Sequence, residues 1–177
     1  LGVVASFSLS KVEASPQFSV TAATPGAIQF SGSGTVDSVC LQNNIATENG
    51  GGIAILDGAV IIKNTSVTEN LATIGGGLFV AENAQALITN SQFISNSADR
   101  YGAGLHVSDA VVTVKNSVFA DNKAQHSGGA YYINNLGPEY DTDGTIIDEH
   151  LAQPFLTLEQ TTLHQNWARV LGQAGYN

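Results

Sequence analysis

The residues most able to do chemistry lie close together near position 140, in the segment NNLGPEYDTDGTIIDEHLAQP. Its acids at 139, 141 and 143 are followed by Gly144, and alternating oxygen ligands before a turn glycine are typical of a calcium-binding loop. That pattern ends on a bidentate glutamate where this segment has His150, so a solvated acidic loop is the alternative interpretation. We expect either no cofactor or a Ca²⁺ ion, with these candidate ligands: Glu139, Asp141, Asp143 and Asp148.

A second candidate site consists of three aromatic side chains, Phe79, His106 and Tyr132. The repeat described below stacks these positions on the outer face of consecutive strands. Exposed rings in a row can contact sugar rings or a partner surface. Cross-strand pairs that only stabilise a sheet are the alternative. We expect this row to be a ligand or partner surface.

Two single residues carry further chemistry. Asn64 begins the sequon Asn64–Thr65–Ser66, which makes it a candidate N-glycosylation site in a secreted chain. Cys40 is the one cysteine of the chain, so an internal disulfide is excluded, and no Cys/His spacing suits zinc. We expect Cys40 to be a small buried side chain.

The elements that position these groups follow from an asparagine repeat. Four asparagines are separated by 26 residues each, and a fifth follows 44 residues later, so it stays in phase after an insertion of 18 residues. An apolar side chain stands three positions before each of them, and an alanine two positions after. The in-phase asparagines are Asn44, Asn70, Asn96, Asn122 and Asn166.

Within each repeat, apolar residues alternate with polar ones in short runs bounded by Gly, Asn, Ser and Asp, which is typical of half-buried strands. No window shows a capped helical period, which excludes α-solenoids. A short repeat made only of strands and turns predicts an all-β parallel β-helix, that is, a β-solenoid in which each unit is one coil. We expect about six coils of about 26 residues.

Repeated glycines and asparagines fit this fold for two different reasons. Runs such as Gly75–Gly76–Gly77 are expected at tight corners, where the backbone has φ > 0 and approaches the next coil closely. Asparagine also tolerates the left-handed conformation, and stacked amides can hydrogen-bond along a column. We therefore expect the five in-phase asparagines to form an internal ladder.

The same register argues against catalysis. Glycosidic hydrolysis needs two carboxylates about 5 to 9.5 Å apart. One outward column has its two acids, Asp37 and Glu159, at opposite ends, and the aromatic column has none. We therefore assign no catalytic residues and expect a protein that is not an enzyme. The alternative is a polysaccharide lyase or glycoside hydrolase of the β-helix class.

Two segments have the form FxxN, Phe93–Ile94–Ser95–Asn96 and Phe119–Ala120–Asp121–Asn122, and glycine-rich segments such as GGGL alternate with them. This alternation resembles the GGAI/FxxN repeats of the chlamydial polymorphic outer-membrane proteins and, more broadly, adhesin-like β-helix proteins. The resemblance extends from about Gly26 to the end of the sequence. It implies a right-handed parallel β-helix, exported to the cell surface and used in adhesion.

The net charge and the short apolar runs exclude two classes of partner. Fifteen acids against six basic residues give a net charge of −9, which disfavours nucleic acid as a partner, and no apolar run is long enough to cross a bilayer.

We expect residues 1–24 to form an N-terminal cap and 25–177 to form the β-helix, with an acidic insertion at about 135–153. Further coils beyond the C-terminal end, or another subunit stacked there, would cover the last edge.

The sequence thus predicts a secreted or cell-surface protein that acts as a rigid structural spacer and an adhesive surface, as part of a filament or a cell-surface assembly. Its expected partners are a protein or a glycan at the cell surface.

Overall fold

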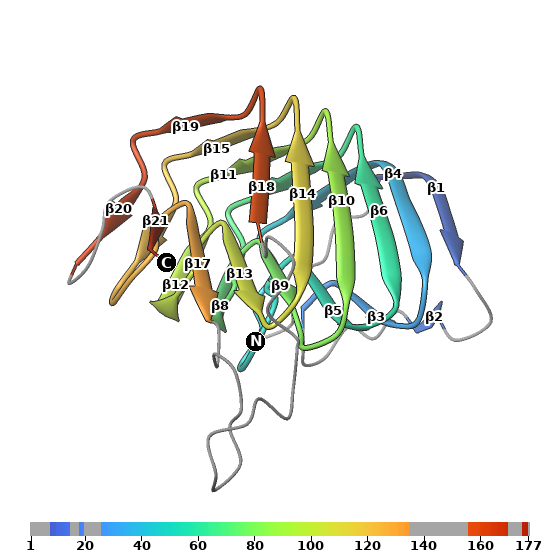
Figure 1. The fold of residues 1–177 in the computed structure, drawn as a ribbon, viewed down its shortest axis with the longest axis horizontal. Coiled ribbons are helices and arrows are strands. Elements are labelled where there is room, and N and C mark those ends of the chain that lie inside the picture. Colours follow the sequence, from blue (N-terminus) through green and yellow to red (C-terminus); the bar gives the residue numbers. More distant parts are fainter. Residues whose placement is uncertain (1–7, 15–17, 20–25, 135–155, 170–174, 177) are drawn as a thin grey trace, which may run out of the picture.

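The computed structural model describes residues 8–14, 18–19, 26–134, 156–169 and 175–176 of the 177-residue chain. The described elements are all short β-strands, which wind into a parallel β-helix as predicted (Figure 1). Each complete coil contributes one strand to each of four rows, and strands of a row pair in parallel with the coils before and after. The predicted fold class is therefore confirmed.

The first two rows form one continuous sheet because the long strand β4 (Gly34–Gln42) belongs to both. Row 1 contains β4, β6 (Ala59–Lys63), β10 (Gln85–Thr89), β14 (Val111–Lys115) and β18 (Leu156–Glu159). Row 2 contains β4, β7 (Ser66–Thr68), β11 (Gln92–Ile94), β15 (Val118–Ala120) and β19 (Thr162–His164).

The other two rows are separate sheets. Row 3 contains β8 (Leu71–Ile74), β12 (Ser97–Tyr101), β16 (Lys123–Ala124) and β20 (Trp167–Ala168). Row 4 contains β3 (Ile28–Ser31), β5 (Ile53–Asp57), β9 (Leu78–Val80), β13 (Leu105–Ser108), β17 (Tyr131–Asn134) and β21 (Gly175–Tyr176).

The number of coils is smaller than predicted. A complete coil needs a strand in every row, and the described residues form 4 strands in row 3, so the structure has about 4 complete turns instead of six. The predicted number included incomplete coils. In the first coil the third side is reduced to the isolated bridge between Ile45 and Leu71.

The register places residues of successive repeats directly over one another. Val67, Phe93 and Phe119 are consecutive partners in row 2. The rings of Phe93 and Phe119 stack with centroids 4.7 Å apart and planes 5° from parallel. Because the same columns continue through every coil, the inward side chains form a single dry core.

The predicted asparagine ladder runs along this core. In each rung the side-chain oxygen of one asparagine accepts hydrogen bonds from both the backbone N–H and the Nδ2 of the asparagine one coil earlier. The Nδ2 of Asn96 also donates to the backbone oxygen of Val67, at 2.9 Å. The ladder therefore satisfies buried backbone and amide groups that would otherwise lack partners. Its rungs are Asn44, Asn70, Asn96, Asn122 and Asn166.

The ladder asparagines are not the left-handed residues of the coil, contrary to the prediction. Left-handed φ falls one position earlier, at residues such as Glu69, Ser95 and Asp121. This separation follows because a ladder side chain must point inward to reach the next rung, while the corner residue that turns the chain points out.

Only the first glycine of each glycine triplet has the expected left-handed φ, as at Gly75. The later ones are small because neighbouring coils approach closely. A Cβ on Gly77 would stand 2.6 Å from the backbone oxygen of Gly104 and 3.1 Å from the Nδ2 of Asn96. Neighbouring coils therefore approach each other closely beside the asparagine ladder.

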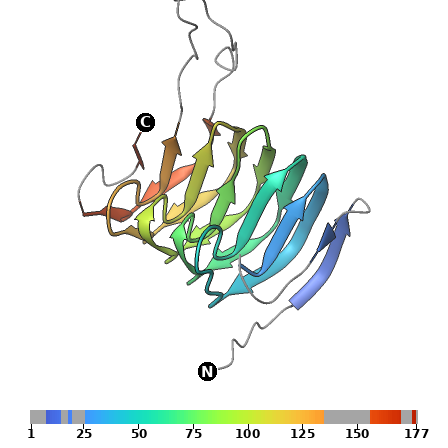
Figure 2. The same cartoon turned by 90° about the horizontal axis from the view of Figure 1, so that it is seen from below.

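The first coil is covered at its N-terminal edge. β1 (Ser8–Ala14) pairs antiparallel with β4, and β2 (Phe18–Ser19) pairs antiparallel with β3. β1 lies outermost at that end of the rod (Figure 2). These antiparallel strands supply hydrogen-bond partners to the backbone groups of the first sheet edge, which would otherwise be open to pairing with another chain.

Replacing a middle rung tests the ladder. Asn96→Ala leaves the N–H and Nδ2 of Asn70 and the oxygen of Val67 without their present partners. At about 1–3 kcal/mol for each buried group, we expect the free energy of unfolding to fall by several kcal/mol. Denaturant unfolding measures it. Asn116→Gly is the matched control, because this exposed asparagine has φ 49° and glycine suits that conformation. An equal loss in both variants would contradict the ladder's role.

Candidate ligand cleft

The predicted aromatic row exists and its rings stack in sequence. Phe79, His106 and Tyr132 come from β9, β13 and β17 of row 4 and are direct register partners. The centroids of Phe79 and His106 are 5.5 Å apart, and those of His106 and Tyr132 are 5.3 Å apart. The planes are within 21° and 19° of parallel, so the ring faces point along the rod and cover one another.

The rings are less exposed than predicted. Phe79 is only 9% exposed and His106 only 4%, while Tyr132 is half-buried. The preceding member of the column, Ala54, is fully buried as well. Mutual stacking explains the difference for the rings, because it removes both faces of a middle ring from solvent.

Tyr101, a residue that sequence reasoning missed, extends the cluster. It lies at the end of β12, just before the corner glycine Gly102, and its ring stacks on Tyr132 at 4.8 Å. His126 meets the Tyr101 ring edge-on at 4.9 Å, and the guanidinium carbon of Arg100 is 5.2 Å from the Tyr101 centroid. The only signal in the sequence was the position of Tyr101, which matches the corner position of Ile74 one coil earlier.

A cleft of about 360 Å³ opens beside this cluster, where the corner after row 3 meets the outer face of row 4. Among the residues that the structure describes, none of its lining side chains is an acid, a lysine or an arginine. Its volume lies within the usual range of small-molecule sites. The lining residues are Asn49, Ile74, Phe79, Tyr101, His106, Ser108, Tyr132 and Asn134.

His106 is electrically neutral in this environment. Burial lowers its pKa from 6.5 to about 4, because a charged imidazole would lose its hydration there. Its Nδ1 is buried and has no hydrogen-bond partner among the described residues. The cleft therefore contains a neutral imidazole with unused hydrogen-bonding capacity.

Row 1, away from the cleft, carries two ion pairs. Lys63 contacts Asp37 at 3.2 Å, and Lys115 contacts Glu159 at 3.0 Å. Hydrogen bonds, first from Asn64 and then from Ser38, lower the pKa of the Asp37 carboxyl. The two acids of this column thus belong to separate ion pairs with basic residues.

Asn64, the predicted glycosylation site, is exposed and has φ 51° at the corner between rows 1 and 2. Its Nδ2, the atom that would carry a glycan, donates to Asp37 Oδ1 at 3.0 Å.

Cys40 is half-buried and its thiol is free. It lies in β4 beside Ser66 of β7.

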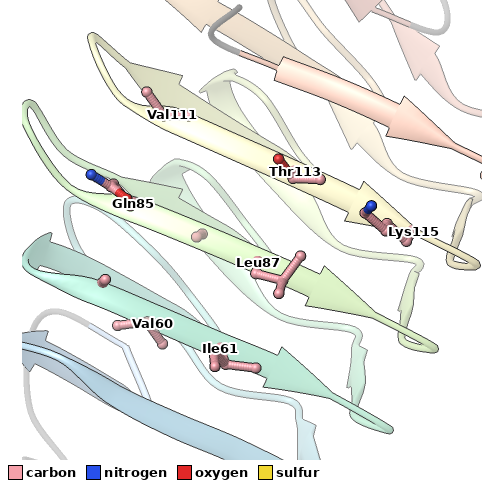
Figure 3. A pocket seen from close by; sticks show the side chains of 9 residues that line it. Val60, Ile61, Gln85, Leu87, Val111, Thr113 and Lys115 are labelled. Atoms are coloured by element: carbon pink, nitrogen blue, oxygen red, sulfur yellow. The ribbon is translucent and has the colours of Figure 1, made fainter. Parts of the chain in front are cut away.

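Row 1 also carries a shallow, largely apolar groove on its outer face (Figure 3). Ile61 and Leu87 project from neighbouring strands and remain 41% and 36% exposed, and Val111 on the next strand is 36% exposed. The groove has a volume of about 390 Å³ and is bordered by Gln85 and Lys115. It lacks the converging polar groups that mark a specific small-molecule site.

The predicted calcium ligands lie outside the described residues: Glu139, Asp141, Asp143 and Asp148. Within the described part of the chain, no group of three or more His, Cys, Asp or Glu side chains could hold a metal ion. In the same residues, no helix has the length and apolar character needed to cross a bilayer.

Register, ladder and stacked columns define the class of this protein as a parallel β-helix. A family model described as "Right handed beta helix region" matches residues 18–149, so the chain belongs to the right-handed β-helix family. Comparisons with curated proteins and with solved structures gave no match.

Burial of His106 predicts a specific pH dependence. Between pH 6.5 and about 4 the unfolded chain binds a proton at this residue and the folded chain does not, so stability falls as the pH falls. The difference in pKa corresponds to about 3 kcal/mol, most of which is lost by about pH 4 and the rest below it. His106→Phe keeps a ring in the stack and removes this contribution. We expect its free energy of unfolding, measured across this window, to decline less than that of the wild type.

The matched control is His164→Phe, which changes an exposed histidine on β19. The control should keep the wild-type decline between pH 6.5 and 4. An unchanged decline in the His106 variant would show that the imidazole is not buried as a neutral group.

Proposed function

We propose that this β-helix is a non-catalytic module outside the cell or at its surface, which acts as a rigid spacer and presents the aromatic cleft as an interaction site. The observation that carries this proposal is the cleft itself: a preformed, uncharged hollow built on packed rings. The resemblance to adhesin-like β-helix repeats supports the adhesive part of the role.

Rigidity of the scaffold supports the spacer role. Each coil is bonded to the next by parallel strands in every row and by the internal ladder. A local opening would therefore break bonds to both neighbouring coils. Such a rod holds a surface site at a defined position along its length.

The chemistry of the cleft favours binding over bond cleavage. Hydrolysis of a glycoside needs an acid and a second carboxylate, and lyase chemistry needs a base beside a bound cation or acid cluster. The described residues that line the cleft include no carboxylate, and the imidazole of His106 among them is neutral at physiological pH. The groups present can donate and accept hydrogen bonds and pack against a ligand.

The C-terminal edge supports an assembly role. Leu158 is 36% exposed although Val114, its partner one coil earlier, is fully buried. Asn166 is the last described rung, and its side-chain oxygen accepts from Asn122 as in the other rungs. We propose that another subunit stacks on this edge, continuing the apolar columns and the ladder.

Adhesion and turnover can be measured on the same material. Beads coated with the protein are incubated with cell-surface polysaccharide and glycoprotein preparations, and bead retention and release of reducing ends are both recorded. We expect saturable retention without release. Release of sugar ends that disappears in Tyr132→Phe would overturn the non-catalytic role, and no retention on any preparation would overturn the adhesive role.

A further inference from the structure

We propose that the aromatic cleft binds an uncharged oligosaccharide segment that lies along the rod. This inference rests on the proposed function and deepens it, because it names the ligand class of the same site. Four properties of the cleft support it: its charge, the orientation of its rings, the positions of its amides and its unsatisfied imidazole nitrogen.

The charge of the cleft selects an uncharged ligand. The chain carries a net charge of −9, yet none of the described side chains that line the cleft bears a formal charge at pH 7. An anionic ligand would meet the repulsion of the whole chain without a basic partner in the lining, and a cation would find no carboxylate there. Arg100 lies against Tyr101 and is not part of the lining.

The rings present their edges to the ligand. Phe79, His106 and Tyr132 cover one another's faces, so the surface they offer outward is the rim of each ring. Ring edges carry partial positive charge, whereas ring faces carry partial negative charge. Edges therefore favour the oxygen atoms of a hydroxyl-rich ligand, and C–H···O contacts of this kind add to its binding. Cationic ligands, which prefer ring faces, gain little here.

Two amides lie far apart along the rod. Asn49 lies one register step before Ile74, and Asn134 lies one step after Ser108. Three coil steps separate the coil of Asn49 from that of Asn134, which corresponds to about 14 Å at the usual spacing of strands. An amide offers a donor and an acceptor side by side, which suits neighbouring hydroxyls of a sugar. The distance favours an extended segment of several sugar rings over a single ring.

His106 supplies an independent indication of a ligand. Its Nδ1 is buried in a side chain that is only 4% exposed, and it has no partner among the described residues. Buried polar atoms in native proteins are nearly always hydrogen-bonded to protein, water or ligand. Ser108 and Tyr132, which also line the cleft, carry further hydroxyls. A bound sugar hydroxyl, or a water held by it, supplies the hydrogen-bond partner that His106 Nδ1 lacks among the described residues.

The test compares ligands of equal length. Neutral tetrasaccharides, namely cellotetraose, maltotetraose and a galactose tetramer, are titrated by calorimetry and by NMR against the whole chain. A uronic-acid tetramer and a tyrosine-containing tetrapeptide are titrated in parallel. We expect at least one neutral tetramer to bind and to shift the His106 ring resonances, and the uronic-acid tetramer and the peptide to bind at least tenfold more weakly.

Variants then locate the site. Asn134→Ala and Ser108→Ala each remove a polar group from the cleft rim, and each should weaken binding about tenfold, the effect of one good hydrogen bond. Gln85→Ala is the matched control, because it removes an exposed amide from the groove on row 1 and should leave the affinity unchanged. Melting temperatures of all variants verify that they are folded.

Three outcomes would overturn the inference: tighter binding of the uronic-acid tetramer, tighter binding of the peptide, or neutral binding that is equal in Asn134→Ala and the wild type. If no neutral tetramer binds while coated beads still adhere to cell-surface material, the saccharide inference fails and the adhesive function stands. If the beads also fail to adhere, both fail.

Discussion

One hydrogen-bonded column determines the rest of this structure. Every ladder asparagine between the first and the last accepts two bonds from the coil before it and donates through its backbone N–H and Nδ2 to the coil after it. A third donated bond runs from Nδ2 to a backbone oxygen of the preceding coil. Because these groups are buried, a rung that slipped by one residue would leave several of them unpaired at once. The ladder thus keeps the register constant, and constant register is what allows Phe93 to stack on Phe119 and Lys63 to meet Asp37.

The same constraint explains where the glycines stand. The ladder amide comes so near the next strand of chain that a methyl group on Gly77 or Gly104 would contact it at 3.1–3.2 Å. The repeated glycines therefore serve two needs, a left-handed turn at the first position and close approach at the later ones. In the middle position of one triplet Ala103 replaces glycine and is fully buried, together with Ala98 and Ala124. The small cluster that they form shows that this side of the coil is tightly packed and has no room for larger side chains.

The sequence predicted the features that the 26-residue repeat controls, and it did not predict the features that are independent of the repeat. The parallel fold, the ladder and the apolar columns follow from identical spacing, since stacked positions must hold compatible side chains. Exposure of Phe79 and His106 could not be predicted in the same way, because it depends on how adjacent rings cover each other. Tyr101 was missed because its column is not chemically uniform: Ile74 and Ser127 are its neighbours above and below. The coil count was overestimated because a periodic residue signals a coil even where one side of it is only an isolated bridge.

The cleft arises from a departure from the repeat, which connects the scaffold to its proposed role. The outer column of row 4 holds Ala54 in one coil, and in the next three coils it holds a ridge of stacked rings, Phe79, His106 and Tyr132. Tyr101 stands beside that ridge from a different row, so the hollow between them is set by two bulky columns on a backbone that the ladder prevents from shifting. Stacking orders these rings before any ligand arrives, which lowers the entropy cost of binding. A neutral imidazole in the middle of the stack is consistent with this arrangement, because a charged one would be poorly solvated between two rings and would favour local opening.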